Sequence, residues 1–145
     1  MYCGIAEAAK RCGISAYALR YYDKEGLLPF VERTYSGTRK FKESDFEWLA
    51  IIACLRETKM PIKQIKIYIQ WCLEGNNTLK ERLKLFLEHK KSIEAQIENM
   101  NRHLKKIDCK INYYTNASNA KTENIHKKSL SKMAKEQYIL KRNRV

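Results

Sequence analysis

Glycine and proline are scarce in this sequence, with five and two residues among 145. That scarcity, together with 31% charged residues, favours a helical protein. A long apolar run is also missing: the longest, residues 48–55, is far shorter than the roughly 20 residues that span a bilayer. The N-terminus lacks the apolar stretch behind a basic start that marks a secretory signal. We expect a cytoplasmic protein with no membrane segment.

An odd number of cysteines without the spacing of a disulfide framework predicts reduced thiols. The five are Cys3, Cys12, Cys54, Cys72 and Cys109. We expect Cys3 and Cys12 to be structural. The histidines have no companion residues that would suggest a catalytic triad, and His89 and His103 are expected to be solvated. The sequence therefore predicts neither an enzyme nor a cofactor.

The formal net charge of +13 indicates a polyanionic partner such as nucleic acid, because lysine and arginine that neutralise phosphates supply most non-specific affinity. The charge is unevenly distributed. Residues 117–145 hold eight basic and two acidic residues, nearly half of the excess. This tail either adds salt-dependent DNA affinity or is a soluble extension, so charge alone does not identify the binding surface.

Two short helices joined by a tight turn are expected near the N-terminus. Residues 5–12 place apolar side chains on one helical face, and Gly13 follows where a left-handed residue would end the helix. Ser15 is a good N-cap for a second helix, which Gly26 can terminate. This pattern is typical of a helix-turn-helix, whose second helix enters the major groove of DNA.

A basic hairpin is expected next, over residues 30–41. β-Branched and aromatic residues flank Ser36 and Gly37 there, as in a turn between two strands. Arg33, Arg39 and Lys40 lie on either side of the turn. We interpret the hairpin as a wing that touches phosphates or a minor groove.

Three further helices are expected. The first spans residues 43–57, the second begins at Pro61 and runs to about residue 74, and Thr78 is an expected N-cap for the third. Apolar residues at alternating spacings of four and three then continue for about five heptads. Such a helix, of some 37 residues and about 55 Å, has an apolar stripe that needs a partner helix, most simply that of a second subunit. The predicted dimer contacts are Leu83, Phe86, Ile93, Ile97, Met100, Leu104, Ile107 and Ile111.

The segments LRYYDKEGLLP at 19–29 and CLRETKMPIKQI at 54–65, followed by the heptad helix, resemble the MerR family of bacterial transcription regulators. The resemblance covers about residues 2–116. The motifs ACLRETKMPIKQI and INYY, at 53–65 and 111–114, are similar to the subgroup that responds to aldehydes and other thiol-reactive electrophiles.

The resemblance implies an all-α fold with a small β wing. It divides residues 1–116 into a winged helix-turn-helix domain (1–74) and a coiled-coil dimerisation helix (75–116). The basic, polar composition of residues 117–145 predicts a disordered or loosely helical tail. Two such chains would form a homodimer through an antiparallel coiled coil and bind double-stranded promoter DNA. The activated dimer would kink and undertwist that DNA so that RNA polymerase can use it.

The resemblance also suggests where this chain contacts DNA. Residues at the start of the second helix would lie nearest base edges, others there would reach phosphates, and the wing would hold the backbone. The expected base-proximal residues are Ser15, Tyr17 and Ala18; the expected phosphate contacts are Arg20, Tyr21, Arg33, Ser36, Gly37, Thr38, Arg39 and Lys40. The alternative for the tyrosines is a place in the core, which we expect for Tyr22 together with Leu19, Leu27 and Leu28. Tyr17 and Ala18 depart from common family residues, so no base preference follows.

Cys54 has two interpretations. It is either a small buried residue of the third helix, or a thiolate stabilised by the start of the fourth helix and by nearby Arg56, Lys59 and Lys63. The subgroup resemblance favours an effector-sensing thiol. Lys59 stands where many relatives have glycine, and a left-handed backbone there would be strained by roughly 1 kcal/mol.

Two alternative functions stay open. Relatives bind metal through cysteines, and in an antiparallel dimer Cys72 of one chain could approach Cys109 of the other, although neither has a paired ligand nearby and we expect no metal site. An architectural DNA-binding protein with no effector is the second alternative.

Overall fold

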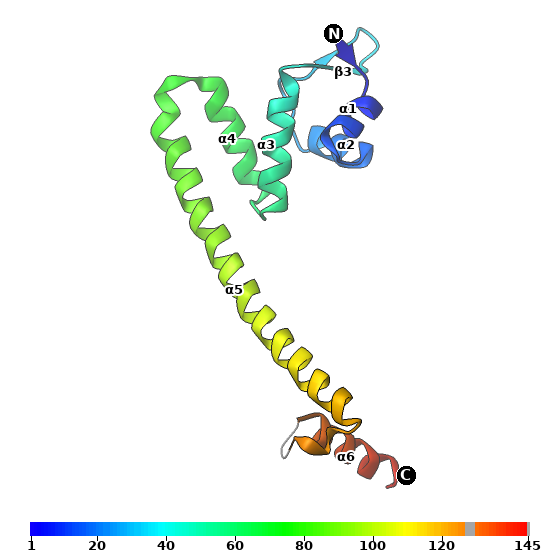
Figure 1. The fold of residues 1–145 in the computed structure, drawn as a ribbon. Helices are drawn as coiled ribbons and strands as arrows, with labels where there is room; N and C mark the ends of the chain where they lie inside the picture. Colours follow the sequence, from blue (N-terminus) through cyan, green and yellow to red (C-terminus); the bar gives the residue numbers. More distant parts are fainter. Residues whose placement is uncertain (127–129, 145) are drawn as a thin grey trace. The chain divides into compact units, whose positions relative to one another are not determined.

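The computed structural model describes residues 1–126 and 130–144, and it is mostly helical (Figure 1). The chain divides into two compact units, Met1–Ile93 and Glu94–Val145. The fold class, all-α with a small antiparallel sheet and one long helix, is confirmed. Among the described residues, no helix is long and apolar enough to cross a membrane.

The helix-turn-helix consists of α1 (Ile5–Cys12) and α2 (Ala16–Lys24). Gly13 ends α1 with a φ of 66°, a left-handed conformation that suits a residue without a side chain. The Ser15 Oγ accepts a hydrogen bond from the Ala18 N–H at 3.0 Å, which caps α2 as predicted. Leu19 and Tyr22 of α2 are buried, so this face of α2 is directed toward the core.

Three short strands form the wing and its base: β1 (Tyr2–Cys3), β2 (Glu32–Arg33) and β3 (Arg39–Lys42). Their order is β1-β3-β2, and both pairs are antiparallel. The hairpin between β2 and β3 was predicted, whereas β1 was not. It pairs Cys3 with Phe41, which anchors the N-terminus to a strand whose central aromatic ring is wholly buried.

Helices α3 (Asp45–Glu57) and α4 (Ile62–Glu74) lie side by side in Figure 1 and complete the core of the first unit. The loop between them contains Lys59 with a φ of 71°, so the expected left-handed, strained backbone is found. The core side chains of this part are Leu49, Ile52, Leu55, Met60, Ile65 and Ile69.

A row of aromatic rings connects the wing side of the unit with the long helix. Phe30 stacks on Trp48 of α3 with ring centroids 5.3 Å apart, and Trp48 lies 6.4 Å from Tyr68 of α4. Tyr68 in turn meets Phe86 edge to face at 5.0 Å. Large rings at these distances pack favourably, so three helices and the loop before β2 share one continuous contact.

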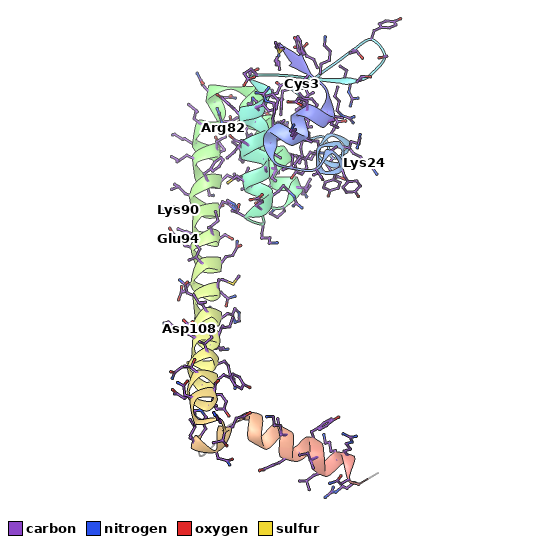
Figure 2. The ribbon with its side chains drawn as sticks, turned by 45° about the vertical axis from the view of Figure 1, so that its right-hand side comes forward. Cys3, Lys24, Arg82, Lys90, Glu94 and Asp108 are labelled. Atoms are coloured by element: carbon purple, nitrogen blue, oxygen red, sulfur yellow. The ribbon has the colours of Figure 1, made fainter. Side chains whose placement is uncertain are left out.

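The long helix α5 (Leu79–Ala120) begins in the first unit and continues into the second. A 3-10 turn, Asn76–Thr78, precedes it. Thr78 does not act as the predicted N-cap; its hydroxyl is directed backward to the carbonyls of Trp71 (2.6 Å) and Gly75 (2.8 Å). Arg82, labelled in the first turns of α5 in Figure 2, donates to the Gly75 carbonyl at 2.8 Å and so fixes the junction of α4 with α5.

The described part of the tail is largely helical. Helix α5 runs to Ala120 rather than to about residue 116, and a second helix, α6, spans Leu130–Arg142. Tyr113 of α5 stacks on His126 with ring centroids 3.9 Å apart, and its hydroxyl donates to Glu123 at 2.8 Å. These contacts depend on residues that are distant in sequence, which a pattern-based prediction cannot pair. Residues 127–129 and 145 of the predicted tail lie outside the described part.

Candidate nucleic-acid interface and thiol site

Helix α2, the predicted recognition helix, has one apolar and one exposed face. Tyr22, Leu19, Leu27 and Leu28 are buried, which confirms their predicted place in the core. On the other face Tyr17 is 78% exposed, and Ser15, Arg20 and Tyr21 are exposed as well. Tyr17 therefore does not belong to the core. Its contact with DNA stays a prediction, as do those of the other residues on this face.

The two wing arginines are tied to the recognition helix rather than free. Arg33 Nη2 lies 2.6 Å from Asp23 Oδ2, and Arg39 Nη2 donates to the same carboxylate oxygen. Arg33 also donates through Nη1 to the Gly37 carbonyl at 2.9 Å. One carboxylate beside two guanidinium groups leaves a net positive charge. The cluster thus braces wing and helix together while keeping an excess of charge that suits a phosphate.

The turn of the wing is tightened by its own polar groups. Thr34 N–H donates to the Thr38 carbonyl at 2.7 Å, Thr38 N–H donates to Thr34 Oγ1 at 3.0 Å, and Gly37 adopts a φ of 85°. Ser36 Oγ is 2.8 Å from Thr34 Oγ1. The wing residues predicted to touch DNA therefore come together in one ordered hairpin.

Two features of the wing were missed. Tyr35 stands fully exposed at the tip, and its place directly before the Ser36–Gly37 pair was the signal that could have found it. Lys40 Nζ lies over the ring of Tyr2, 4.4 Å from its centroid, which is a cation–π contact. Both aromatic side chains sit beside predicted phosphate contacts.

Cys54 is exposed on α3, while its neighbours Ile52 and Leu55 are buried. The interpretation of Cys54 as a buried packing residue is therefore wrong: its position on the helix faces away from the core. Arg56, one of the cations expected near the thiol, donates to the Met60 carbonyl at 3.3 Å. The fold thus leaves the thiol of Cys54 accessible to solvent.

His89 is not solvated as predicted. It is half-buried, and its Nε2 lies 2.7 Å from Oγ1 of Thr58, the residue that follows α3. The Thr58 hydroxyl also donates to the Cys54 carbonyl at 2.7 Å. A cavity of about 480 Å³ adjoins this contact and is lined in part by Lys59, Gln64 and His89. The heptad pattern gave no sign of this contact, because it cannot show that α3 ends against His89.

The remaining cysteines differ in their surroundings. Cys3 and Cys12 are half-buried against the core, and burial raises the pKa of the Cys12 thiol, in keeping with structural roles. Arg82 Nη1 is 3.8 Å from the Sγ of Cys72, where a guanidinium group would oppose a bound cation. Cys109 is exposed on α5. Among the described residues, no group of three or more histidine, cysteine or acidic side chains could hold a metal ion.

Comparison with known proteins agrees with this geometry. Residues 3–71 match the family model described as MerR HTH family regulatory protein. An HTH-type transcriptional regulator of Haemophilus influenzae is 43% identical over 112 residues, which cover 77% of this chain and 83% of the relative. The chain belongs to the MerR family. It is thus a DNA-binding transcriptional regulator of the MerR type, and not an enzyme.

Two further regulators are similar to this chain. The regulator AdhR of Bacillus subtilis is 34% identical over 89 residues, or 61% of this chain and 64% of AdhR. The crystal structure of HiNmlR, a MerR family regulator lacking the sensor domain, bound to promoter DNA, is similar with a TM-score of 0.77 and 39% identity, covering 86% of this chain and 99% of HiNmlR. This MerR protein therefore falls in a subgroup with these two.

Proposed function

We propose that the chain is a homodimeric regulator that distorts promoter DNA when a thiol-reactive signal, an aldehyde, another electrophile or an oxidant, modifies Cys54. The observation that carries the proposal is the exposed thiol of Cys54 inside the DNA-binding unit, on a helix whose other face builds the core. Because α3 packs into the core of this unit, a modification of Cys54 would act on the DNA-binding unit directly, with no intervening sensor domain.

The proposed DNA surface combines the exposed face of α2 with the wing. Tyr17 and Arg20 would lie at the major groove, and the wing cations would hold flanking phosphates. The ion pairs of Arg33 and Arg39 with Asp23 support this assignment because they fix the wing relative to the recognition helix. HiNmlR, which is similar over most of its length, was crystallised on promoter DNA.

The proposed dimer forms through α5. Many of its apolar side chains are exposed in the single chain, among them Leu83 at 62% and Met100 at 67%. Covering such side chains contributes about 1.5–3 kcal/mol each. The other predicted contacts that are exposed by more than half are Ile97, Leu104, Ile107 and Ile111. Phe86 already packs on Tyr68 of its own chain, and Ile93 is half-buried, so these two would add less.

The chemistry proposed at Cys54 for an aldehyde is addition. The sulfur of the thiolate forms a bond to the carbonyl carbon, the π electron pair of the carbonyl moves to its oxygen, and that oxygen takes the proton that the thiol gave up. The product is a hemithioacetal. Only an accessible sulfur can follow this course, and the exposure of Cys54 meets that requirement.

Transcription from the chain's own promoter in a purified system, with RNA polymerase and formaldehyde, tests the sensing. Cys54→Ala should abolish induction while operator affinity stays within about twofold, because Cys54 lies outside the proposed DNA surface. The matched control is Cys109→Ser, which removes the exposed thiol on α5 and should leave induction intact. Full induction in Cys54→Ala would exclude Cys54 as the sensor.

Footprinting separates the regulator from an architectural DNA-binding protein. A regulator should protect one short pseudo-palindrome in a promoter at physiological salt. Protection of all DNA with little sequence preference would support the architectural alternative instead.

A further inference from the structure

We propose that the hydrogen bond between Thr58 and His89 transmits the state of Cys54 to the long helix α5. The inference rests on the proposed function, because it takes Cys54 as the residue that is modified. It assigns a positioning role to two residues that lie outside the proposed DNA surface.

The direction of the hydrogen bonds follows from the single proton of the Thr58 hydroxyl. Thr58 Oγ1 donates that proton to the Cys54 carbonyl at 2.7 Å, and the backbone N–H of Thr58 donates to the same carbonyl at 3.0 Å. With that proton donated to the Cys54 carbonyl, Oγ1 accepts a hydrogen bond from His89 Nε2 at 2.7 Å, in the tautomer that carries its proton on Nε2. A continuous chain of three polar groups thus runs from the peptide of Cys54 to α5.

Thr58 caps the C-terminal end of α3 four residues after Cys54, and its N–H donates to the Cys54 carbonyl as in a further helical turn. Residues four apart on a helix have Cβ atoms about 5–6 Å apart, so a group added to the Cys54 sulfur comes to lie beside the Thr58 side chain. A hemithioacetal also brings a new hydroxyl, which can donate and accept hydrogen bonds. It would compete for the Thr58 hydroxyl, and His89 would lose its partner.

The surroundings of His89 allow the ring to respond. The side chain is half-buried and forms part of the wall of the cavity of about 480 Å³. Its polar neighbours along that wall include Lys59, Gln64 and Glu88. A ring released from Thr58 thus finds space and other hydrogen-bonding groups, and need not return to its first position.

The change would affect helix α5, because the hydrogen bond between Thr58 and His89 lies four residues before the end of the first unit at Ile93. Leu85 and Phe86 pack against the core, and His89 follows one turn later; Figure 2 labels its neighbour Lys90. The bond to Thr58 therefore extends the attachment of α5 by one turn beyond its last core contacts. Losing it would loosen this turn and alter how the DNA-binding unit is held on the dimer helix.

Amide hydrogen exchange on the full-length protein tests the inference without a promoter. Cys54 is alkylated with N-ethylmaleimide in a Cys109→Ser background, and mass spectrometry verifies the site. Alkylation should raise exchange over residues 83–92 about fivefold, the effect of one lost hydrogen bond. Thr58→Val and His89→Ala should show the raised exchange before alkylation and no further rise after it.

Matched controls are present in the chain. Thr115, on α5, donates its hydroxyl to the Ile111 carbonyl at 2.7 Å, and His103 is an exposed histidine of the same helix. Thr115→Val and His103→Ala should both respond to alkylation like the parent protein. If Thr58→Val fails to fold by circular dichroism, His89→Ala carries the test, with Thr58→Ser as a variant that retains the hydroxyl and should behave like the parent.

Unchanged exchange over residues 83–92 after alkylation of the parent, or an equal rise in His89→Ala, would overturn the inference. Either result would leave Cys54 sensing standing, since that is judged by induction in Cys54→Ala. Conversely, induction that survives Cys54→Ala would reject the proposed function, while the exchange experiment would still decide whether Thr58 and His89 couple α3 to α5.

Discussion

Asp23 is the residue on which the geometry of the wing depends most. Its side chain is only 12% exposed and receives hydrogen bonds from Arg33 and Arg39. Arg39 is itself largely covered, so removal of the carboxylate would leave a partly buried guanidinium group without its counter-charge. The contrasting pair of Arg11 with Glu43 lies in solvent, since the Glu43 side chain is 78% exposed.

Asp23→Ala should lower the free energy of unfolding by about 1–3 kcal/mol, the usual effect of leaving a charged partner unsatisfied. The matched variant Glu43→Ala should change it by less than about 1 kcal/mol, because exposed ion pairs contribute little. Urea unfolding followed by circular dichroism measures both. Equal effects of the two variants would show that the Asp23 cluster is no stronger than a surface pair.

Tyr68 should make the protein sensitive to alkaline pH. Burial, followed by a hydrogen bond with Cys72, raises the pKa of Tyr68 to about 12. In the unfolded chain the tyrosine titrates near 10, so above that pH the unfolded state releases the proton first. The associated stability is fully present below about pH 10 and is lost as pH rises through the folded-state pKa.

Tyr68→Phe should therefore lose less stability than the parent protein between about pH 10 and about pH 12 in urea unfolding. Tyr35→Phe, which changes a fully exposed ring, should follow the parent. A Tyr68→Phe curve parallel to that of the parent would contradict the assignment.

At the scale of elements, the sequence predicted the ends of helices from local signals, but it did not predict contacts between elements that are distant in sequence. Gly13 and Ser15 set the ends of α1 and α2 through neighbours a few residues away, and the sequence was sufficient to predict them. Strand β1 has two residues, too few for a periodic pattern, and its partner strand lies almost 40 residues away.

In the candidate site, too, local features could be predicted from the sequence and contacts between distant residues could not. Periodicity indicated which side of α2 is exposed, but it could not show that Asp23 holds the wing or that His89 meets Thr58. Such contacts join residues that are 10 to 31 positions apart, and only the packing of whole helices decides them. The stacking of Tyr113 on His126 is likewise a contact that a local pattern cannot predict.

The loop between α3 and α4 offers a test of backbone strain. Lys59 has a φ of 71°, a conformation that glycine adopts without steric penalty. Lys59→Gly should raise the free energy of unfolding by up to about 1 kcal/mol, the relieved strain less the added entropy of the unfolded chain. Lys63→Gly, inside α4, should instead lower it by about 1 kcal/mol. Differential scanning calorimetry of both variants measures the difference, and destabilisation in each would argue against strain at Lys59.

At the scale of the whole molecule, α5 governs assembly. Met100 is 67% exposed in the single chain and belongs to the apolar stripe. Met100→Glu would place a carboxylate in the proposed interface of both chains, where its charge is poorly solvated. We expect the dimer dissociation constant to rise at least about a hundredfold, since each contact contributes on the order of 1.5 kcal/mol and occurs twice.

Analytical ultracentrifugation at micromolar concentration would measure that change. Asn101→Glu adds the same charge one position away, off the stripe, and should remain dimeric. A parent protein that sediments as a monomer, or a Met100→Glu variant that stays dimeric, would exclude α5 as the interface.

Helix α5 packs on the core of the DNA-binding unit through Leu85 and Phe86 and belongs to both units as one helix. In the proposed dimer the separation of the two DNA-reading heads is consequently set by a count of residues, at about 10 Å for every seven. Deletion or duplication of one heptad would change the distance between the two heads, so the protein would prefer promoters with differently spaced half-sites. Every base-facing side chain would stay the same. Operator spacing and operator sequence can then diverge independently in evolution.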